Sequence, residues 1–90
     1  MKLVYDPDAA AAVRELMEDS TRQDLLGKVL AALEALSANP GDRLCRRRSY
    51  EVRRPLWAMD VRSRSDEWVI LWRQEEGEDQ ITVRYVGPRF

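Results

Sequence analysis

The sequence predicts an α+β domain in which two helices cover one face of an antiparallel sheet. Three observations carry this prediction. Apolar and polar residues alternate with period two through the last third of the chain, which is typical of strands. Apolar residues between positions 25 and 36 recur at steps of three and four, which is typical of a helix. Asn39-Pro40-Gly41 ends that helix before the alternating region begins.

The chain opens on a short strand that leads directly into the first helix. Residues 2–5 alternate between two faces, and Asp6-Pro7-Asp8 follows them. Asp6 is placed to cap the helix, Pro7 suits its first position, and Asp8 suits the positive end of its dipole. We therefore expect this helix over residues 7–18.

The second helix follows after a very short gap, so the two helices form an antiparallel αα-hairpin. Ser20-Thr21-Arg22-Gln23 has the pattern of a capping box. The apolar stripe comprises Leu25, Leu26, Val29, Leu30, Leu33 and Leu36. Such a stripe is more often core than a dimerisation seam. We expect the hairpin to cover the sheet.

The rest of the chain predicts an antiparallel meander. An irregular basic segment over 43–48 leads into a strand at 49–53. Three further strands span 57–62, 68–73 and 81–86, separated by polar, turn-prone loops. The side expected to face the helices carries Trp57, Met59, Val61, Trp68, Ile70, Trp72, Ile81, Val83 and Tyr85. The layout is β-α-α-β-β-β-β, in one domain over residues 1–90.

Charge is divided unevenly along the chain. Residues 1–42 hold four basic and eight acidic side chains, whereas residues 43–90 hold eleven arginines and eight acidic side chains. Arginine binds phosphate and carboxylate in two-point geometry and stacks on bases. A basic half therefore suggests an anionic partner. The alternative is an arginine-rich surface that is only solvated.

The chain lacks the residues that several common kinds of site need. The chain has no histidine and a single cysteine, Cys45. This excludes an internal disulfide, an ordinary zinc site, and Ser-His-Asp or Cys-His catalysis. The acidic residues at 75–79 are more typical of a solvated hairpin tip than of a calcium loop. We expect no metal, no cofactor and a structural thiol. A lone thiol fits the cytosol, and no apolar run is long enough to span a membrane.

Arginine side chains are the remaining candidates for a functional site. Alternation places Arg62, Arg73 and Arg84 on the uncovered face of the sheet, and these three with Arg89 can form a phosphate clamp. Asp60 is the only plausible base on that face, but a salt bridge to Arg62 or Arg73 is the preferred interpretation. The remaining candidates for anion or nucleic-acid binding are Arg46, Arg47, Arg48 and Arg54.

The order of these elements resembles the RelE/ParE superfamily of bacterial type II toxins. The resemblance covers nearly the whole chain. It rests on the opening Val4-Tyr5 with Pro7 and Ala9, the helix end at Leu33, Leu36, Asn39 and Pro40, and the meander motifs Trp57-x-Met59-x-Val61-Arg62, Glu67-Trp68-Val69-Ile70-Leu71-Trp72 and Val83-Arg84-Tyr85-Val86-Gly87-Pro88-Arg89.

The resemblance implies a cytosolic toxin that a small acidic antitoxin neutralises. RelE-type members cleave messenger RNA on the ribosome, and ParE-type members act on DNA gyrase. Of the RelE-type cleavage set, only Arg89 is retained. The other matched positions hold Ala58, Asp60 and Val69, and the tyrosine of a C-terminal helix has no counterpart.

Three functions therefore stay open. The first is a ribosome-dependent endoribonuclease in which Arg62 and Arg84 join Arg89 as substitute catalytic residues. The second is a ParE-like inhibitor that cuts no RNA, and the third is a protein of the toxin fold that only binds its antitoxin. All three predict an acidic partner. Val69 and Leu71, which are apolar and on the uncovered face, are the expected antitoxin contacts, and an edge strand can accept a partner strand.

Overall fold

The computed structural model describes residues 1–50, 55–75 and 79–90. It contains two α-helices, five strands and two short 3₁₀ turns, in the order expected from the sequence. The elements are β1 (Lys2–Tyr5), α1 (Pro7–Glu18), η1 (Ser20–Arg22), α2 (Gln23–Ala38), η2 (Arg43–Cys45), β2 (Arg48–Ser49), β3 (Trp57–Arg62), β4 (Glu67–Gln74) and β5 (Gln80–Pro88). The predicted α+β class is confirmed.

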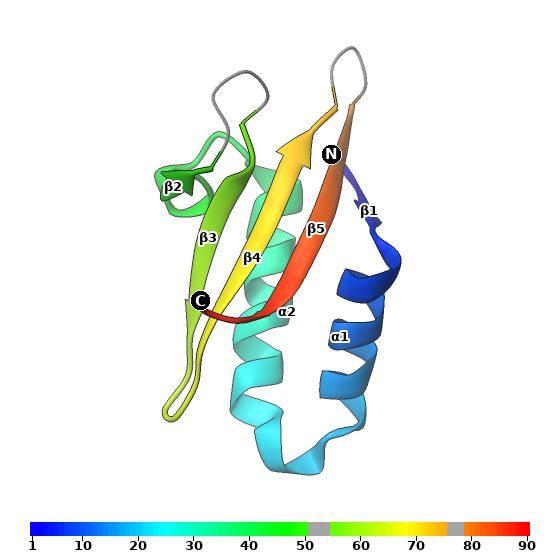
Figure 1. The fold of residues 1–90 in the computed structure, drawn as a ribbon, viewed down its shortest axis with the longest axis vertical. Helices are drawn as coiled ribbons and strands as arrows, with labels where there is room; N and C mark the ends of the chain where they lie inside the picture. Colours follow the sequence, from blue (N-terminus) through cyan, green and yellow to red (C-terminus); the bar gives the residue numbers. More distant parts are fainter. Residues whose placement is uncertain (51–54, 76–78) are drawn as a thin grey trace.

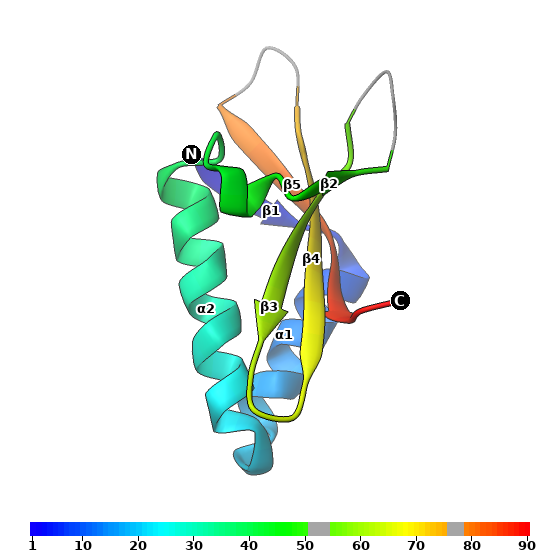
Figure 2. The same cartoon turned by 90° about the vertical axis from the view of Figure 1, so that its left-hand side faces the viewer.

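The strands form one sheet in the order β1-β5-β4-β3-β2, and both helices pack on the same face of it (Figures 1 and 2). The pairs from β2 to β5 are antiparallel, as the meander predicts. The first strand instead lies parallel to β5, so the sheet is mixed and not purely antiparallel. Parallel neighbours need a long connection. The two helices and three strands between β1 and β5 provide it.

The helices begin somewhat differently from the sequence prediction. Asp6 precedes α1 and Pro7 opens it, but the Asp6 side chain makes no capping hydrogen bond. Its carboxylate instead pairs with the Arg84 guanidinium, at 2.6 Å. Ahead of α2, Ser20 is not the cap; the carboxylate of Asp19 accepts the backbone N–H of Thr21 at 2.9 Å. The Asn39 end of α2 is as predicted.

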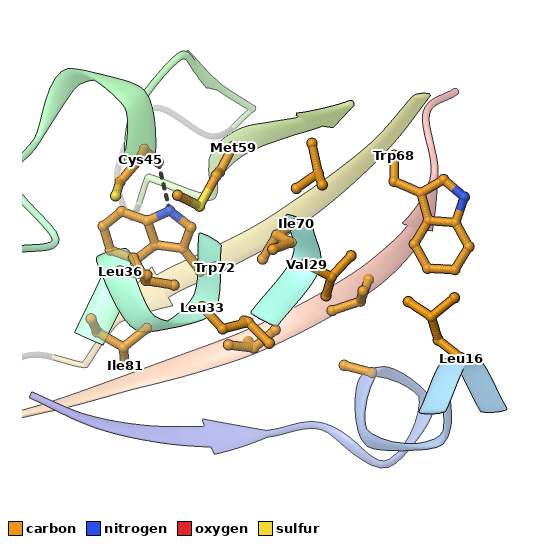
Figure 3. Close-up of a cluster of buried hydrophobic side chains, with 14 of the residues drawn as sticks. Leu16, Val29, Leu33, Leu36, Cys45, Met59, Trp68, Ile70, Trp72 and Ile81 are labelled. Carbon is orange, nitrogen blue, oxygen red and sulfur yellow. Dashed lines mark hydrogen bonds between the residues drawn. The ribbon is translucent and has the colours of Figure 1, made fainter. Parts of the chain in front are cut away.

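The core lies between the helix pair and one face of the sheet. Figure 3 shows the Trp72 indole among Leu33, Leu36, Met59 and Ile70. Its Nε1–H donates to the Cys45 carbonyl oxygen at 2.7 Å, which satisfies the one polar group of this buried ring. The same bond fixes η2 against the sheet. The prediction that the tryptophans face the helices is confirmed, although Trp57 is only half-buried.

A β-bulge in β5 changes which side chains face the core. Leu71 pairs with Tyr85 and Trp72 with Val83, so Arg84 is an extra residue between the two pairs. One extra residue reverses the alternation beyond it. The prediction of Tyr85 in the core is therefore wrong: Val86 takes that place, and Tyr85 lies on the opposite face.

The face of the sheet opposite the helices, which we call the open face, carries a second small apolar cluster. Ala58, Val69 and Leu71 are buried there, and Leu56 and Tyr85 pack against them. The C-terminal segment crosses this face from the end of β5 towards β3 (Figures 1 and 2). Both faces of the central strand are thus covered, which is unusual for an antiparallel pair in a domain of this size.

The second strand begins at Arg48, one residue before the predicted start. Arg48 pairs with Ala58 and Ser49 with Trp57. Tyr50 follows the strand as a bend, and residues 51–53 of the predicted strand, with Arg54, lie outside the described residues. Among the described residues, no helix combines the length and the hydropathy needed to cross a membrane.

Candidate functional site

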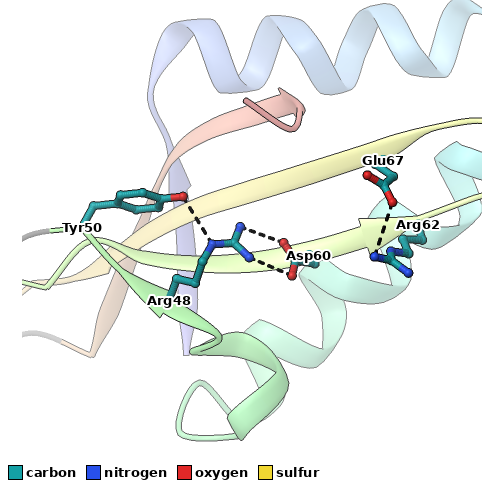
Figure 4. Close-up of polar contacts among 5 residues, drawn as sticks. All are labelled: Arg48, Tyr50, Asp60, Arg62 and Glu67. Atoms are coloured by element: carbon teal, nitrogen blue, oxygen red, sulfur yellow. Dashed lines mark hydrogen bonds and ion pairs between the residues drawn. The ribbon is translucent and has the colours of Figure 1, made fainter.

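A two-point ion pair lies at the centre of the candidate site (Figure 4). Arg48 Nη1 and Nη2 donate to the two carboxylate oxygens of Asp60 at 3.0 and 2.9 Å. Arg48 Nε also donates to the Tyr50 hydroxyl at 3.3 Å. The hydrogen bonds from Arg48 lower the pKa of the Asp60 carboxyl below its ordinary value, and partial burial opposes the shift only in part. The expected salt bridge of Asp60 exists, but its partner is Arg48 and not Arg62 or Arg73.

Two further arginines act on the same carboxylate from a greater distance. The charges of Arg89 and Arg47 lower the pKa of Asp60 further. Both side chains are exposed, and neither makes a hydrogen bond or ion pair within the described part of the chain. We call Arg47, Arg48 and Arg89, gathered around Asp60, the arginine cluster. One carboxylate neutralises one of its three charges, so the cluster keeps a positive surplus for an anion.

Backbone pairing brings Arg89 to this place. Its N–H donates to the Glu67 carbonyl oxygen at 2.9 Å, which holds the C-terminal segment against the start of β4. The Glu67 carboxylate pairs with Arg62 at 3.4 Å, with both side chains exposed. Two of the three expected catalytic arginines therefore contact Glu67, Arg62 through its guanidinium and Arg89 through its backbone N–H.

The third expected catalytic arginine, Arg84, lies elsewhere. The bulge and the ion pair with Asp6 hold it beside β1, at the opposite edge of the sheet. Because β4 lies between the strands of Arg84 and Arg62 and Arg84 is ion-paired to Asp6, Arg84 does not join Arg62 and Arg89 as the predicted clamp requires. Alternation along a strand cannot predict a bulge, because the inserted residue carries no signal in the period-two pattern.

The remaining predicted anion-binding residues are dispersed. Arg73 is half-buried on the open face, about 13 Å along β4 from the level of Asp60, at the usual rise of about 3.3 Å per residue. Arg46 lies on the other side of the sheet, over the rings of Trp57 and Trp72. Among the described members of this set, Arg47 and Arg48 join the cluster, and Arg54 lies outside the described residues.

The expected antitoxin contacts lie on the predicted face but are not accessible. Val69 is 1% exposed and Leu71 is 8% exposed. A partner reaches them only if the covering side chains move. Their role in partner binding stays a prediction, and their expected exposure is wrong because Tyr85, turned outward by the bulge, packs with them.

Three aromatic rings beside the cluster were not predicted as site residues. Phe90 lies 5.6 Å from Tyr85 and 5.9 Å from Tyr50, between ring centroids. Phe90 is 72% exposed and Tyr50 is 49% exposed. Their sequence signal is weak: Tyr50 lies two residues after Arg48, and Phe90 directly follows Arg89. Exposed aromatic rings next to arginines are typical of surfaces that bind single-stranded nucleic acid.

The chemistry of the site is that of anion binding. Asp60 is a weak base because its pKa is lowered. The Cys45 thiol is buried, and burial followed by the charge of Asp42 raises its pKa despite Arg46, so it fits the structural role expected for it. No three His, Cys, Asp or Glu side chains among the described residues lie close enough to hold a metal ion.

Comparison of the chain with protein-family models, with curated proteins and with solved structures finds no match. Function is therefore inferred from this chain's own residues, and the likeness to RelE/ParE toxins rests on the order of elements and the motifs given above.

Proposed function

We propose that the protein is a toxin of the RelE/ParE kind that acts in the cytoplasm on messenger RNA bound to the ribosome. One observation carries the proposal: Arg48 and Arg89 lie with three aromatic rings on the open face, and Arg47 lies beside them near the β2 edge. The predicted order of strand, helix pair and meander is the second support.

The arginines suit the phosphate of a nucleotide, and the aromatic rings suit its base. Guanidinium groups bind phosphate oxygens through paired hydrogen bonds. Aromatic rings stack on bases, and this stacking contributes about 1–3 kcal/mol per base. Single-stranded RNA exposes both parts at once, whereas duplex RNA hides the faces of its bases. A single strand on the open face is the substrate that this arrangement suits best.

Cleavage on this surface would depend on charge stabilisation. Arg62 and Arg89 are placed to hold the phosphate and to stabilise negative charge as it develops on its oxygens. Asp60, ion-paired to Arg48, is a poor acceptor for the 2′-hydroxyl proton. The described residues of this surface therefore supply the clamp, and Asp60 is not an efficient base.

The poor ability of Asp60 to accept a proton favours a second candidate function. A ParE-like inhibitor of DNA gyrase, or a protein that only binds an antitoxin, needs a binding surface and no base. Arg84 pairs with Asp6 beside β1 and is not part of the arginine cluster, which points the same way. Both candidate functions keep a small acidic antitoxin as the partner, and the β3 edge of the sheet supports binding of such a partner. The second strand covers only Trp57 and Ala58, so Met59–Arg62 has no neighbouring strand on that side among the described residues and can accept a strand from a small acidic protein.

The proposal is tested by inducing the protein in a bacterium and mapping both transcript ends and plasmid supercoiling. We expect growth arrest with new 5′ ends inside translated messages. Arg89→Ala should lower the yield of these ends at least about tenfold, because it removes a group that stabilises developing charge. Arg14→Ala is the matched control: Arg14 is an exposed arginine on α1, away from the open face.

The other outcomes decide against the proposal in different ways. Relaxed plasmids with intact transcripts would establish the ParE-like candidate instead. Normal growth at full expression would exclude both toxic activities and leave antitoxin binding alone.

A further inference from the structure

A second basic surface lies outside the open face, where η2 and β2 meet the start of β3. It is a hollow of about 590 Å³ lined by Gly41, Arg43, Arg46, Arg47, Arg48 and Trp57. We call it the basic hollow. Four of its six lining residues are arginines and none is acidic. The nearest acidic side chain in the sequence, Asp42, is occupied in capping η2, where it accepts the Leu44 N–H at 2.8 Å.

One cation of the hollow is held in place before any ligand arrives. The Arg46 guanidinium lies 5.1 Å from the Trp57 ring and 5.6 Å from the Trp72 ring. Its Nε donates to the Pro40 carbonyl oxygen at 2.9 Å. Trp72 is itself fixed by its hydrogen bond to Cys45. A side chain ordered in this way loses little conformational entropy when it binds an anion.

The other arginines of the hollow differ in whether their guanidinium groups are already paired. Arg43 and Arg47 are exposed and make no side-chain hydrogen bond or ion pair within the described ranges. Arg48 is bound to Asp60. The hollow thus carries three guanidinium groups that no carboxylate neutralises directly among the residues described. Such a density of positive charge is unfavourable without an anion.

Arg47 and Arg48 belong to both surfaces. They line the basic hollow, and they also form the arginine cluster with Arg89. The two surfaces are therefore continuous around the β2 edge of the sheet. A ligand with charges repeated along its length can contact both.

We propose that the basic hollow is a second phosphate subsite for the single-stranded RNA that occupies the open face. This inference rests on the proposed function and extends it: the RNA backbone continues from Arg89 past Arg48 and Arg47 to Arg46 and Arg43. The ligand recognised is a chain of phosphodiesters, because a single anion would fill one surface only.

The test measures binding of a fluorescently labelled, unstructured oligouridylate across a series of salt concentrations. Removing one arginine that binds a phosphate should reduce the slope of log affinity against log salt by about 0.7, which is roughly a fivefold weaker affinity near 0.1 M salt. We expect this change for Arg43→Gln, which alters the hollow alone, and for Arg89→Gln, which alters the open face alone. Arg14→Gln on α1 should leave affinity and slope unchanged.

The variants separate the two proposals. If Arg43→Gln matches Arg14→Gln while Arg89→Gln weakens binding, the subsite in the hollow is excluded and the open face stands. If only Arg43→Gln weakens binding, RNA binds the hollow alone, and both the open-face site and the continuous path from Arg89 are excluded. If the RNA does not bind, but Arg43→Gln weakens binding of an oligoglutamate peptide, the hollow binds an acidic protein and the inference is overturned.

Discussion

At the scale of the residue, Asp60 decides what the open face can do. Its carboxylate lies among three arginines, and Arg48 binds both of its oxygens. A carboxylate in this position organises the cations around it and does not act as an efficient base. The sequence could place Asp60 among arginines, but it could not select Arg48, because the pairing of β2 with β3 decides which arginine comes within reach.

The pairing of Asp60 with Arg48 predicts how Asp60→Asn changes stability with pH. The folded-state pKa of Asp60 is lowered, so its charge stabilises the fold above the unfolded-state pKa of about 3.9. That contribution disappears as pH falls through the folded-state pKa. We expect the wild-type protein to exceed the variant in free energy of unfolding by up to about 1 kcal/mol near neutral pH. Urea unfolding should show the two proteins converging in acid, below about pH 4.

The control for this comparison is Glu34→Gln, at an exposed position of α2 with no ion pair among the described residues. Its stability should follow the wild-type protein across the pH range. A constant difference between wild type and Asp60→Asn down to the lowest pH would show that the effect comes from packing and not from the charge.

At the scale of the element, β5 shows how far a pattern of alternation can be used. Period two correctly placed Ile81 and Val83 in the core. It failed from Tyr85 onward, because the bulge at Arg84 inserts a residue that leaves no mark in the sequence. The same bulge turns Tyr85 towards the arginine cluster, whereas Arg84 pairs with Asp6 beside β1. A single local irregularity thus accounts for the wrong placement of Tyr85.

The packing of Tyr85 depends on a glycine, which gives a prediction at this scale. A Cβ on Gly87 would lie 2.6 Å from the Tyr85 hydroxyl oxygen and 2.8 Å from the adjoining ring carbon. The ring cannot turn away easily, because its hydroxyl donates to the Pro88 carbonyl oxygen at 2.8 Å. We expect Gly87→Ala to lower the free energy of unfolding by about 1–3 kcal/mol, measured by urea denaturation.

The same substitution at Gly27 should have the opposite sign. Gly27 lies inside α2, and a Cβ added there would meet no atom within 4 Å. Alanine should raise the free energy of unfolding by about 0.5–1 kcal/mol, because it restricts the unfolded chain and suits a helix.

The cause of the Gly87→Ala effect is tested in a Tyr85→Leu background. If Gly87→Ala lowers the free energy of unfolding as much in that background as in the wild type, contact with the tyrosine ring is not the cause.

At the scale of the whole molecule, the fold and the candidate site rest on different kinds of information. The class, the helix pair and the meander follow from local patterns, and these were predicted. The parallel placement of β1 was not, because it depends on where the chain returns after the helices. The site joins the consecutive elements η2, β2 and β3 to the C-terminal segment, which is distant from them in sequence. Its composition could be predicted from the arginines, but its geometry could not.

The distribution of stability over the molecule should separate the core from the candidate site. The central strand β4 is hydrogen-bonded on both sides and buried on both faces, with Ile70 and Trp72 at 0% exposure. Its amides can exchange with solvent only when the whole protein unfolds. The Arg47 N–H is bonded to the Ala58 carbonyl at 3.0 Å beside β2, and the Arg89 N–H is bonded to the Glu67 carbonyl in the C-terminal segment; both residues are exposed. These can open locally.

Native-state hydrogen exchange followed by NMR measures this difference. We expect the free energy of exchange at Ile70 and Trp72 to fall with urea as steeply as global stability does. At Arg47 and Arg89 it should be lower and nearly independent of urea, because local opening exposes little surface. Equal protection and equal urea dependence at all four amides would contradict the prediction. The arginines proposed to bind RNA would then belong to the rigid core unit, and not to segments that can adjust to a flexible RNA.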